Sequence, residues 1–171
     1  QSERFAPERL MRAMVLPAPR TRLQMEERPD PTPGEGQLRV KISACGVCRT
    51  DLHLVDAELP DIRYPIVPGH EIVGRVTLVG PNVTTHAPGD RVGIPWLHTA
   101  CGFCPHCITG WETLCDGQQN TGYSVNGSFA EYALADPNYV GRLPAGLDWG
   151  PAAPVLCAGV TVYKGLKETE V

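Results

Sequence analysis

Four cysteines packed into one short stretch constrain this chain more than any other feature. They follow the spacing Cys-x2-Cys-x2-Cys-x7-Cys and are Cys101, Cys104, Cys107 and Cys115. Thiolates three positions apart in a loop can converge on one ion, and Zn²⁺ accepts four sulfur ligands in a tetrahedral arrangement. Four thiolates leave no coordination position open. The stretch therefore predicts a structural zinc site, held in a lobe over residues 99–116.

Two other interpretations of these four cysteines are disfavoured. Buried thiols or disulfides fit poorly, because cysteines so closely spaced in a loop rarely pack into a core. A zinc ribbon that binds nucleic acid fits poorly as well, because no basic, aromatic-rich segment accompanies the lobe. His98 and His106 lie beside the lobe. Since four sulfurs complete the zinc shell, we expect both imidazoles at the surface.

A second set of metal-ligand candidates is spread along the chain. It comprises Cys45, Cys48 and His53 in one group, His70 and Glu71 in another, and Cys157 far downstream. Two thiolates and one imidazole would leave the fourth position of a zinc ion open for water or substrate. Such an ion acts as a Lewis acid, which lowers the pKa of a bound hydroxyl and polarises a bound carbonyl. An open site of this kind would be catalytic, and either role suits hydride transfer between an alcohol and a carbonyl compound.

The segment Cys45-Gly-Val-Cys48 has an alternative interpretation as a thioredoxin-like redox pair, because a CGVC motif follows a strand at the start of a helix. That interpretation leaves His70 and Cys157 unexplained. If zinc is bound instead, Cys45 is a small apolar residue at the end of the strand.

Short apolar segments punctuated by 18 glycines and 17 prolines indicate an irregular, mainly β domain with many turns. The alternation is clearest over 37–44, where every second residue is apolar. We expect a short helix that Thr50 or Asp51 caps and that ends at Val55. A helical turn is expected near 108–113, and a helix over 151–167. Further strands are expected over 11–16, 23–27, 71–80, 91–94, 128–135 and 139–143. Together these elements predict a small, partly open β-barrel with short helices.

Composition excludes several classes of function. The net charge of −4 comes from interspersed acids and bases, so we expect neither a nucleic-acid nor a membrane partner. No apolar run approaches the length of a membrane span, and residues 1–12 lack the apolar region of a secretory signal. Seven cysteines, mostly at metal spacing, favour a reducing compartment, hence the cytoplasm.

Several motifs together resemble one family. The zinc-dependent medium-chain alcohol dehydrogenases carry a zinc signature that is similar along its whole length to Gly69-His70-Glu71-x2-Gly74-x5-Gly80-x2-Val83. Residues 48–53 resemble the family's catalytic-cysteine segment, 101–115 its structural lobe, and 155–163 the segment with its last catalytic ligand. The resemblance covers about residues 11–167.

The resemblance implies the family's N-terminal catalytic domain, with its GroES-like β-barrel. We expect an N-terminal extension over 1–10, the catalytic domain over 11–150, and a terminal helix over 151–171 that leads toward a cofactor-binding domain. The family's Rossmann domain is expected to be absent from this chain, because no G-x-G-x-x-G motif follows a strand.

The resemblance also implies roles at the catalytic zinc. Cys48, His70 and Cys157 would hold the ion, a ligand set known from alcohol dehydrogenase. Glu71 would lie behind the metal and approach it when bound water moves. Asp51 would orient the imidazole of His70, since a zinc-bound histidine commonly donates its other N–H to a carboxylate.

Other matching positions imply contacts with substrate and cofactor. Thr50 would accept the proton of the substrate hydroxyl and pass it, through the cofactor ribose, to His53 at the solvent. Trp96 would limit the size of the substrate. Arg49 would lie near the cofactor pyrophosphate.

The implied enzyme carries two zinc ions per chain and uses NAD or NADP to oxidise a primary or secondary alcohol reversibly to an aldehyde or ketone. Its substrate would be a small molecule. The parent enzyme would be a homo-oligomer, whereas the chain alone could be a monomer that lacks the hydride carrier. The competing hypothesis is a zinc-stabilised module that binds a small molecule or a partner without catalysis.

Overall fold

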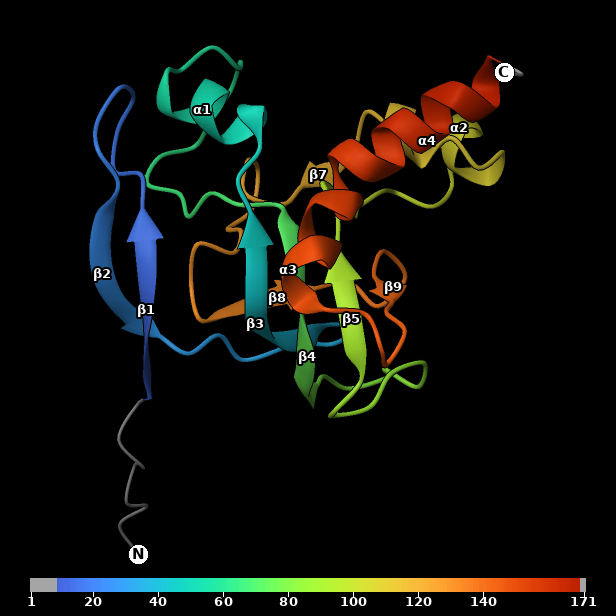
Figure 1. The fold of residues 1–171 in the computed structure, drawn as a ribbon, viewed down its shortest axis with the longest axis horizontal. Helices are drawn as coiled ribbons and strands as arrows, with labels where there is room; N and C mark the ends of the chain where they lie inside the picture. Colours follow the sequence, from blue (N-terminus) through green and yellow to red (C-terminus); the bar gives the residue numbers. More distant parts are fainter. Residues whose placement is uncertain (1–8, 170–171) are drawn as a thin grey trace, which may run out of the picture.

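The computed structural model describes residues 9–169, and its centre is a five-stranded antiparallel sheet (Figure 1). The strand order is β8-β3-β4-β5-β9. Residues 1–8 of the expected N-terminal extension lie outside the described part. The five strands of this sheet are β3 (Leu38–Gly46), β4 (Glu71–Val79), β5 (Arg91–Ile94), β8 (Tyr132–Ala135) and β9 (Gly141–Arg142).

The inner face of this sheet carries the main core. Leu38 and Val40 of β3 are fully buried there, as the period-two alternation over 37–44 predicts. They pack with buried residues of the neighbouring strands, which are Ile72, Val76, Val92, Ile94, Ala133 and Ala135.

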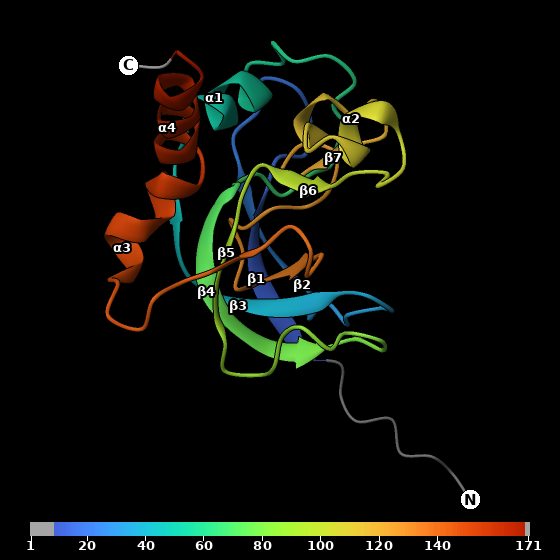
Figure 2. The same cartoon turned by 90° about the vertical axis from the view of Figure 1, so that its right-hand side faces the viewer.

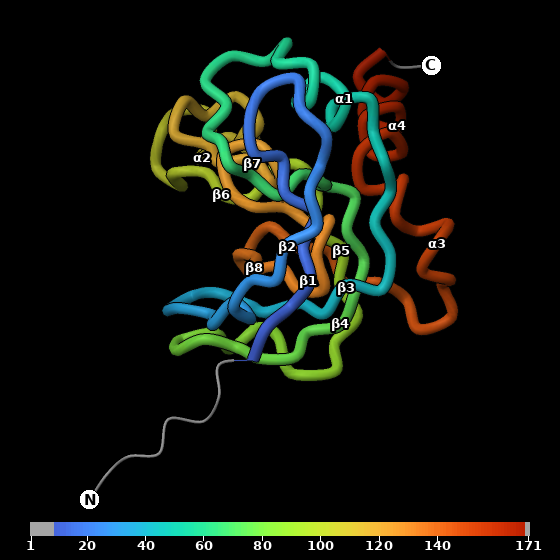
Figure 3. Tube along the Cα trace, turned by 90° about the vertical axis from the view of Figure 1, so that its left-hand side faces the viewer, coloured from blue at the N-terminus to red at the C-terminus, as the bar shows by residue number. Residues whose placement is uncertain are grey.

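A two-stranded ribbon closes one side of the barrel. It consists of β1 (Leu10–Val15) and β2 (Gln24–Pro29), and Figure 3 shows it in front of the sheet. An isolated bridge joins Ala13 to Ala130, and the backbone N–H of Met14 donates to the carbonyl of Phe129. Separate sheets joined by such bridges form the partly open barrel that the sequence predicts.

One ion pair reinforces this seam. The carboxylate of Glu131 accepts from the Arg12 backbone N–H at 2.8 Å and from its guanidinium at 3.0 Å. These bonds lower the pKa of Glu131. A depressed folded-state pKa means that the carboxylate stabilises the fold above its unfolded pKa of about 4.3 and loses this effect as pH falls through the folded value.

The Glu131→Gln variant should therefore have a lower free energy of unfolding than the wild type at neutral pH. The difference should shrink on acidification below the unfolded pKa of about 4.3 and vanish below the lower folded-state pKa, where the wild-type carboxylate is also neutral in the folded protein. Urea unfolding at several pH values measures this. An Arg12→Ala background is the control, since Glu131→Gln should have little effect there. A difference that persists unchanged in acid would contradict the assignment.

Most of the remaining elements gather at one end of the barrel, whereas the first of the C-terminal helices lies against the main sheet (Figures 1 and 2). They comprise the helix that follows β3, a lobe of short elements, and the C-terminal helices. In chain order these are α1 (Arg49–Val55), β6 (Leu97–Thr99), α2 (Pro105–Ile108), η1 (Glu112–Leu114), β7 (Gln119–Asn120), α3 (Trp149–Ala152), η2 (Ala153–Leu156) and α4 (Ala158–Glu168). Among the described residues, none of these helices combines the length and apolar character needed to cross a membrane.

The structure corrects the predicted helices. The segment over 151–167 is interrupted at Cys157, whose φ of −126° and ψ of −78° are not helical. Pro154, which has no N–H to donate, lies in the first turn of η2, where α3 gives way to η2. Cys48, not Thr50 or Asp51, is the N-cap of α1. The turn expected near 108–113 is two short helices, α2 and η1, on either side of Gly110, whose φ is +83°.

The structure also corrects several strands. β8 and β9 are shorter than predicted. At the predicted start of β8, the N–H groups of Ser128 and Phe129 donate to the carbonyl of Pro68 and not to a strand ladder. β6 and β7 were not predicted, since both are very short. His98, expected at the surface, is 7% exposed, because β6 turns it inward.

Candidate metal centres

Antiparallel pairing of β3 with β4 brings two of the predicted ligands together. Gly46 at the end of β3 lies opposite Glu71 at the start of β4. Cys48 therefore follows one strand and His70 precedes the other at the same edge of the sheet. Residues 22 positions apart in sequence thus become neighbours.

The third predicted ligand comes from the break between η2 and α4. The Sγ atom of Cys157 lies 3.7 Å from that of Cys48. One donor atom each from Cys48, His70, Glu71 and Cys157 lies within 4.8 Å of the others. This is the spacing of ligands around one ion, and we name these four residues the mixed site.

His70 is fully buried, yet neither of its ring nitrogens has a hydrogen-bond partner among the described residues. The nearest carboxylate oxygen, Oδ1 of Asp51, lies 3.5 Å from Nδ1. A buried polar group without a partner is costly. A metal ion bound at one nitrogen would remove that cost, so the imidazole fits a ligand role.

The thiols of Cys48 and Cys157 also indicate that the mixed site binds a cation. Burial, together with the adjacent Cys48, raises the pKa of Cys157 to about 12. Burial also acts to raise the pKa of Cys48, but the backbone N–H and hydroxyl of Thr50 outweigh it and lower this pKa. Two thiolates this close repel each other, so both can ionise only if a positive ion lies between them.

Burial and neighbouring charges also set the pKa of the His70 imidazole. Burial alone would lower the pKa of His70, but the carboxylate of Asp51 and the thiolate of Cys48 raise it overall. The mixed site is thus negative enough to attract a cation of either kind, a proton or a metal.

Asp51 ties the two ligand segments together. Its Oδ2 atom accepts from the backbone N–H of Cys48 at 2.9 Å, and its Oδ1 atom accepts from the N–H of Gly69 at 3.1 Å. One buried carboxylate therefore fixes the backbone on both sides of the site. Sequence reasoning anticipated only its contact with the imidazole.

Glu71 reaches the mixed site through a gap that a glycine leaves. Its side chain is buried against Gly46, where a Cβ atom would lie 1.8 Å from Glu71 Oε2. Any other residue at position 46 would displace the carboxylate. Sequence reasoning missed this role of Gly46, because the contact exists only after the strands pair.

A cavity of about 460 Å³ opens beside the mixed site. The ring of Trp96 stands edge-on to His70, with ring centroids 5.0 Å apart, and stacks on Tyr123 at 5.6 Å. The wall is mainly apolar, contributed by Pro95, Trp96, Leu97, Leu156 and Val160. Thr50 and Cys157 bring polar atoms to it, so the cavity suits a small molecule with one polar end.

The predicted relay residues divide between the cavity and the surface. Thr50 lines the cavity, and its Oγ1 atom lies 3.7 Å from Cys48 Sγ. His53 is one turn further along α1, half-buried, and its Nδ1 atom pairs with the carboxylate of Glu58. Arg49 is exposed at the first residue of α1. The structure brings only Thr50 of these residues to the cavity wall.

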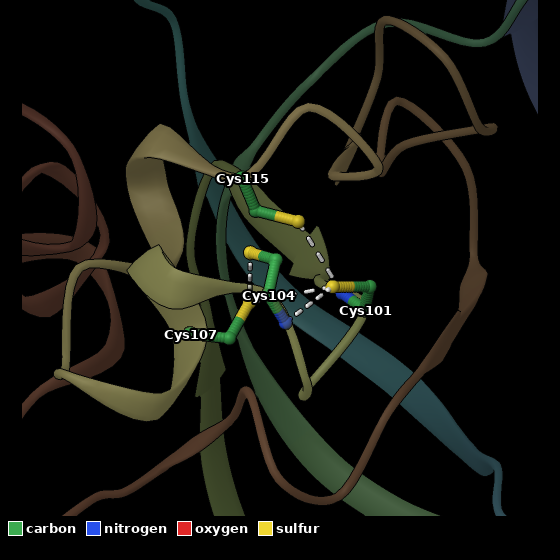
Figure 4. A group of neighbouring side chains, drawn as sticks. All are labelled: Cys101, Cys104, Cys107 and Cys115. Carbon is green, nitrogen blue, oxygen red and sulfur yellow. Dashed lines mark hydrogen bonds between the residues drawn. The ribbon is translucent and has the colours of Figure 1, made fainter.

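The four lobe cysteines converge as their spacing predicts (Figure 4). Their sulfur atoms all lie within 4.8 Å of one another, and the closest pair, Cys104 and Cys107, is 3.5 Å apart. Cys107 and Cys115 are buried. His106, beside the cluster, is exposed.

The lobe backbone favours thiolates. N–H groups of Phe103 and Cys104 point at the sulfur of Cys101 and lower its pKa to about 6. Burial, with neighbouring thiols, raises the pKa of Cys107 to about 12. As at the mixed site, a cation is required before every sulfur can ionise together.

Cys45 does not belong to either site. The hydroxyl of Ser128 donates to its sulfur at 2.8 Å, and burial raises its pKa to about 11. A reactive thiol has a depressed pKa. The alternative of a redox pair between Cys45 and Cys48 is therefore disfavoured.

Comparison with known proteins points to one family. Residues 34–145 match the family model of the alcohol dehydrogenase GroES-like domain. An alcohol dehydrogenase of Rhizobium meliloti (strain 1021) is 65% identical over 151 residues, which are 87% of this chain and 44% of that protein.

Solved structures give the same result. A cobalt- and zinc-bound thermostable alcohol dehydrogenase from Pyrobaculum aerophilum matches with a TM-score of 0.83 and 29% identity, over 91% of this chain and 47% of that one. An acetophenone reductase from Geotrichum candidum, in complex with NAD, matches with a TM-score of 0.86 and 30% identity, over 97% and 49%. The chain thus spans about half the length of the proteins it resembles.

Proposed function

Because this chain belongs to the zinc-dependent medium-chain alcohol dehydrogenases, as their N-terminal GroES-like domain, we propose that it supplies the catalytic metal site of an alcohol-oxidising enzyme. The reaction is the reversible oxidation of a primary or secondary alcohol to an aldehyde or ketone. A hydride passes from the carbinol carbon to NAD⁺ or NADP⁺, and the hydroxyl proton leaves to solvent.

The observation that carries this proposal is the buried, unpartnered imidazole of His70 among the donors of Cys48, Cys157 and Glu71, next to a cavity. A zinc ion held by Cys48, His70 and Cys157 supplies a Lewis acid, which polarises a carbonyl and lowers the pKa of a hydroxyl. Glu71 lies close enough to serve as an alternative ligand. Asp51 holds the ligand backbone in place.

The chain's own side chains guide substrate and proton. Thr50 presents its hydroxyl at the cavity wall, where it would accept the proton of the substrate hydroxyl and release its own, through the cofactor ribose, toward His53. His53, one turn along α1, passes that proton to solvent, with its Nδ1 atom held by Glu58. Trp96 narrows the cavity and limits the substrate, and Arg49 contacts the cofactor pyrophosphate.

Several further features belong to the same proposal. The lobe holds a second zinc ion, which is structural, so that each chain carries two. All seven cysteines are free thiols, which favours a reducing compartment, hence the cytoplasm. Residues 11–150 form the catalytic domain, residues 151–171 lead toward a cofactor-binding domain, and the natural enzyme is a homo-oligomer.

Removal of the Thr50 hydroxyl tests the proposal. In the intact natural protein, Thr50→Val should lower kcat for alcohol oxidation by about a hundredfold or more, the usual contribution of general acid–base catalysis. Thr50→Ser is the matched control, because it keeps the hydroxyl and should retain most of the activity. Initial rates with NAD⁺ and NADP⁺ over a panel of small alcohols measure the effect.

The same assay separates the enzyme from a binding module. No alcohol oxidation with either cofactor, by a protein shown to contain two zinc ions, would contradict the proposal and favour a non-catalytic module. Equal kcat values for the Val and Ser variants would remove Thr50 from the proton path.

A further inference from the structure

We propose that Gly93 is a positioning residue for Cys157. Because position 93 has no side chain, Leu156 can pack directly on the sheet, and this contact sets the position of the thiol of Cys157, the next residue. The inference rests on the proposed function, since it concerns the mixed site. It adds a residue that lies on a different element from every proposed ligand.

A row of small residues crosses the outer face of the main sheet. The strand registers place Ala44 opposite Val73, Val73 opposite Gly93, and Gly93 opposite Gly141. Ala152 and Ala153, from α3 and η2, pack against Val73 on this face. The C-terminal segment can therefore approach the sheet backbone closely.

A side chain at position 93 would collide with Leu156, which also packs on the cluster around Val73. A Cβ atom at position 93 would lie 2.7 Å and 2.8 Å from the two methyl carbons of Leu156, closer than real contacts allow. A Cβ atom at Gly141, the next residue of the row, would meet nothing within 4 Å. Neither glycine has a positive φ, so alanine is acceptable to the backbone at both positions.

Leu156 directly precedes Cys157 and is one of the contacts that hold η2 on the sheet. Cys157 is the single residue between η2 and α4, and its non-helical backbone sets the direction of its thiol. α4 has no buried residue in the described part of the chain, so it supplies little packing of its own. The position of the thiol thus depends on how η2 is anchored, and Leu156 is the η2 residue next to it.

The other end of the segment is anchored on the same strand face. The guanidinium of Arg91 lies 3.5 Å from the centre of the Trp149 ring and donates to the carbonyl of Leu147. Arg91 and Gly93 are two positions apart in β5, so they share a face. β5 therefore contacts the C-terminal segment at two points. The side chain of Arg91 holds the start of α3, and the absence of a side chain at Gly93 makes room for the end of η2.

The test compares Gly93→Ala with Gly141→Ala in the intact natural protein. The readout is the dissociation constant of Co²⁺ at each site, followed by the absorption bands of mixed and all-sulfur coordination. Gly93→Ala should weaken the mixed site by at least about tenfold, the typical effect of misplacing a ligand through its support. The lobe affinity, and both affinities in Gly141→Ala, should stay within about twofold of the wild type.

A double variant shows whether the contact itself is responsible. Leu156→Ala removes the clashing methyl groups, so adding Gly93→Ala to it should change the mixed-site affinity by less than about twofold. If Gly93→Ala alone does not fold, this pair decides the question. Equal mixed-site affinities in Leu156→Ala and in the double variant would support the inference. A weaker mixed-site affinity in the double variant than in Leu156→Ala would overturn it.

The remaining outcomes are also decisive. Unchanged mixed-site affinity in Gly93→Ala would overturn the inference and leave the proposed function intact. Equal weakening of both sites would overturn it too, because that pattern indicates general destabilisation. A wild-type protein that binds Co²⁺ only at the lobe would instead contradict the proposed function on which the inference rests.

Discussion

Replacing His70 with alanine should abolish alcohol oxidation and release one of two zinc ions, while the lobe keeps the other. The imidazole is fully buried among the donors of the mixed site, and alanine leaves two thiols 3.7 Å apart without a third strong ligand. A catalytic metal contributes several kcal/mol to charge stabilisation in the transition state. We therefore expect kcat/KM to fall by about a thousandfold or more. Steady-state kinetics and the zinc content of the same preparation measure both effects.

His106→Ala is the matched control, because this imidazole is exposed beside the lobe cysteines and belongs to neither site. It should keep both zinc ions and normal activity. Near-wild-type turnover in His70→Ala would show that the reacting atoms lie elsewhere. Loss of both zinc ions would show that the variant had disrupted the whole domain.

The second large effect concerns stability. Replacing Cys115 with serine should unfold the lobe while the main sheet stays intact. Cys115 is 1% exposed, and the lobe contains only short elements, so the four sulfurs and their ion are its main source of order. Binding of a structural zinc is worth about 10–16 kcal/mol in small zinc domains. That exceeds what such short elements can supply without it.

Hydrogen exchange followed by mass spectrometry measures this effect. Backbone amides over 97–120 should lose protection in Cys115→Ser, whereas those of β3 and β4 should keep theirs. Cys45→Ser is the matched control, because that thiol is buried but lies outside both sites. Wild-type protection across the lobe in Cys115→Ser would contradict a structural metal there.

Unfolding of the lobe should also disturb the cavity beside the mixed site. Thr113, in η1, lines the cavity beside the mixed site. Lys164 of α4 places its ammonium 4.3 Å from the centre of the Trp111 ring, which joins the terminal helix to the lobe. The structural site therefore supports one wall of the proposed active site.

Much of this arrangement could be predicted from the sequence because its chemistry rests on uncommon residue types at fixed spacing. Cysteines three apart have few other uses in a loop, so the lobe cluster followed from spacing alone. The alternation over 37–44 identified β3, and its end marked where Cys48 would lie. The fold class followed from short apolar segments between glycines and prolines.

Other features of the site depend on which side chain packs opposite a given residue in the fold, and the spacing of residues in the sequence does not reveal this. Gly46 and Gly93 matter because Glu71 and Leu156 occupy the space a side chain would need. The helix predicted over 151–167 breaks at Cys157, although apolar pattern alone favours continuity. His98 was predicted at the surface because the sequence gives no sign of β6, the short strand that buries it.

The central claim is that the chain carries two metal sites of different ligand composition, one closed and one open. Anomalous diffraction at the zinc absorption edge, on crystals of the natural protein, tests it most directly. We predict two peaks, one among the four lobe sulfurs and one between Cys48, His70 and Cys157. A single peak at the lobe, with none at the mixed site, would contradict the account.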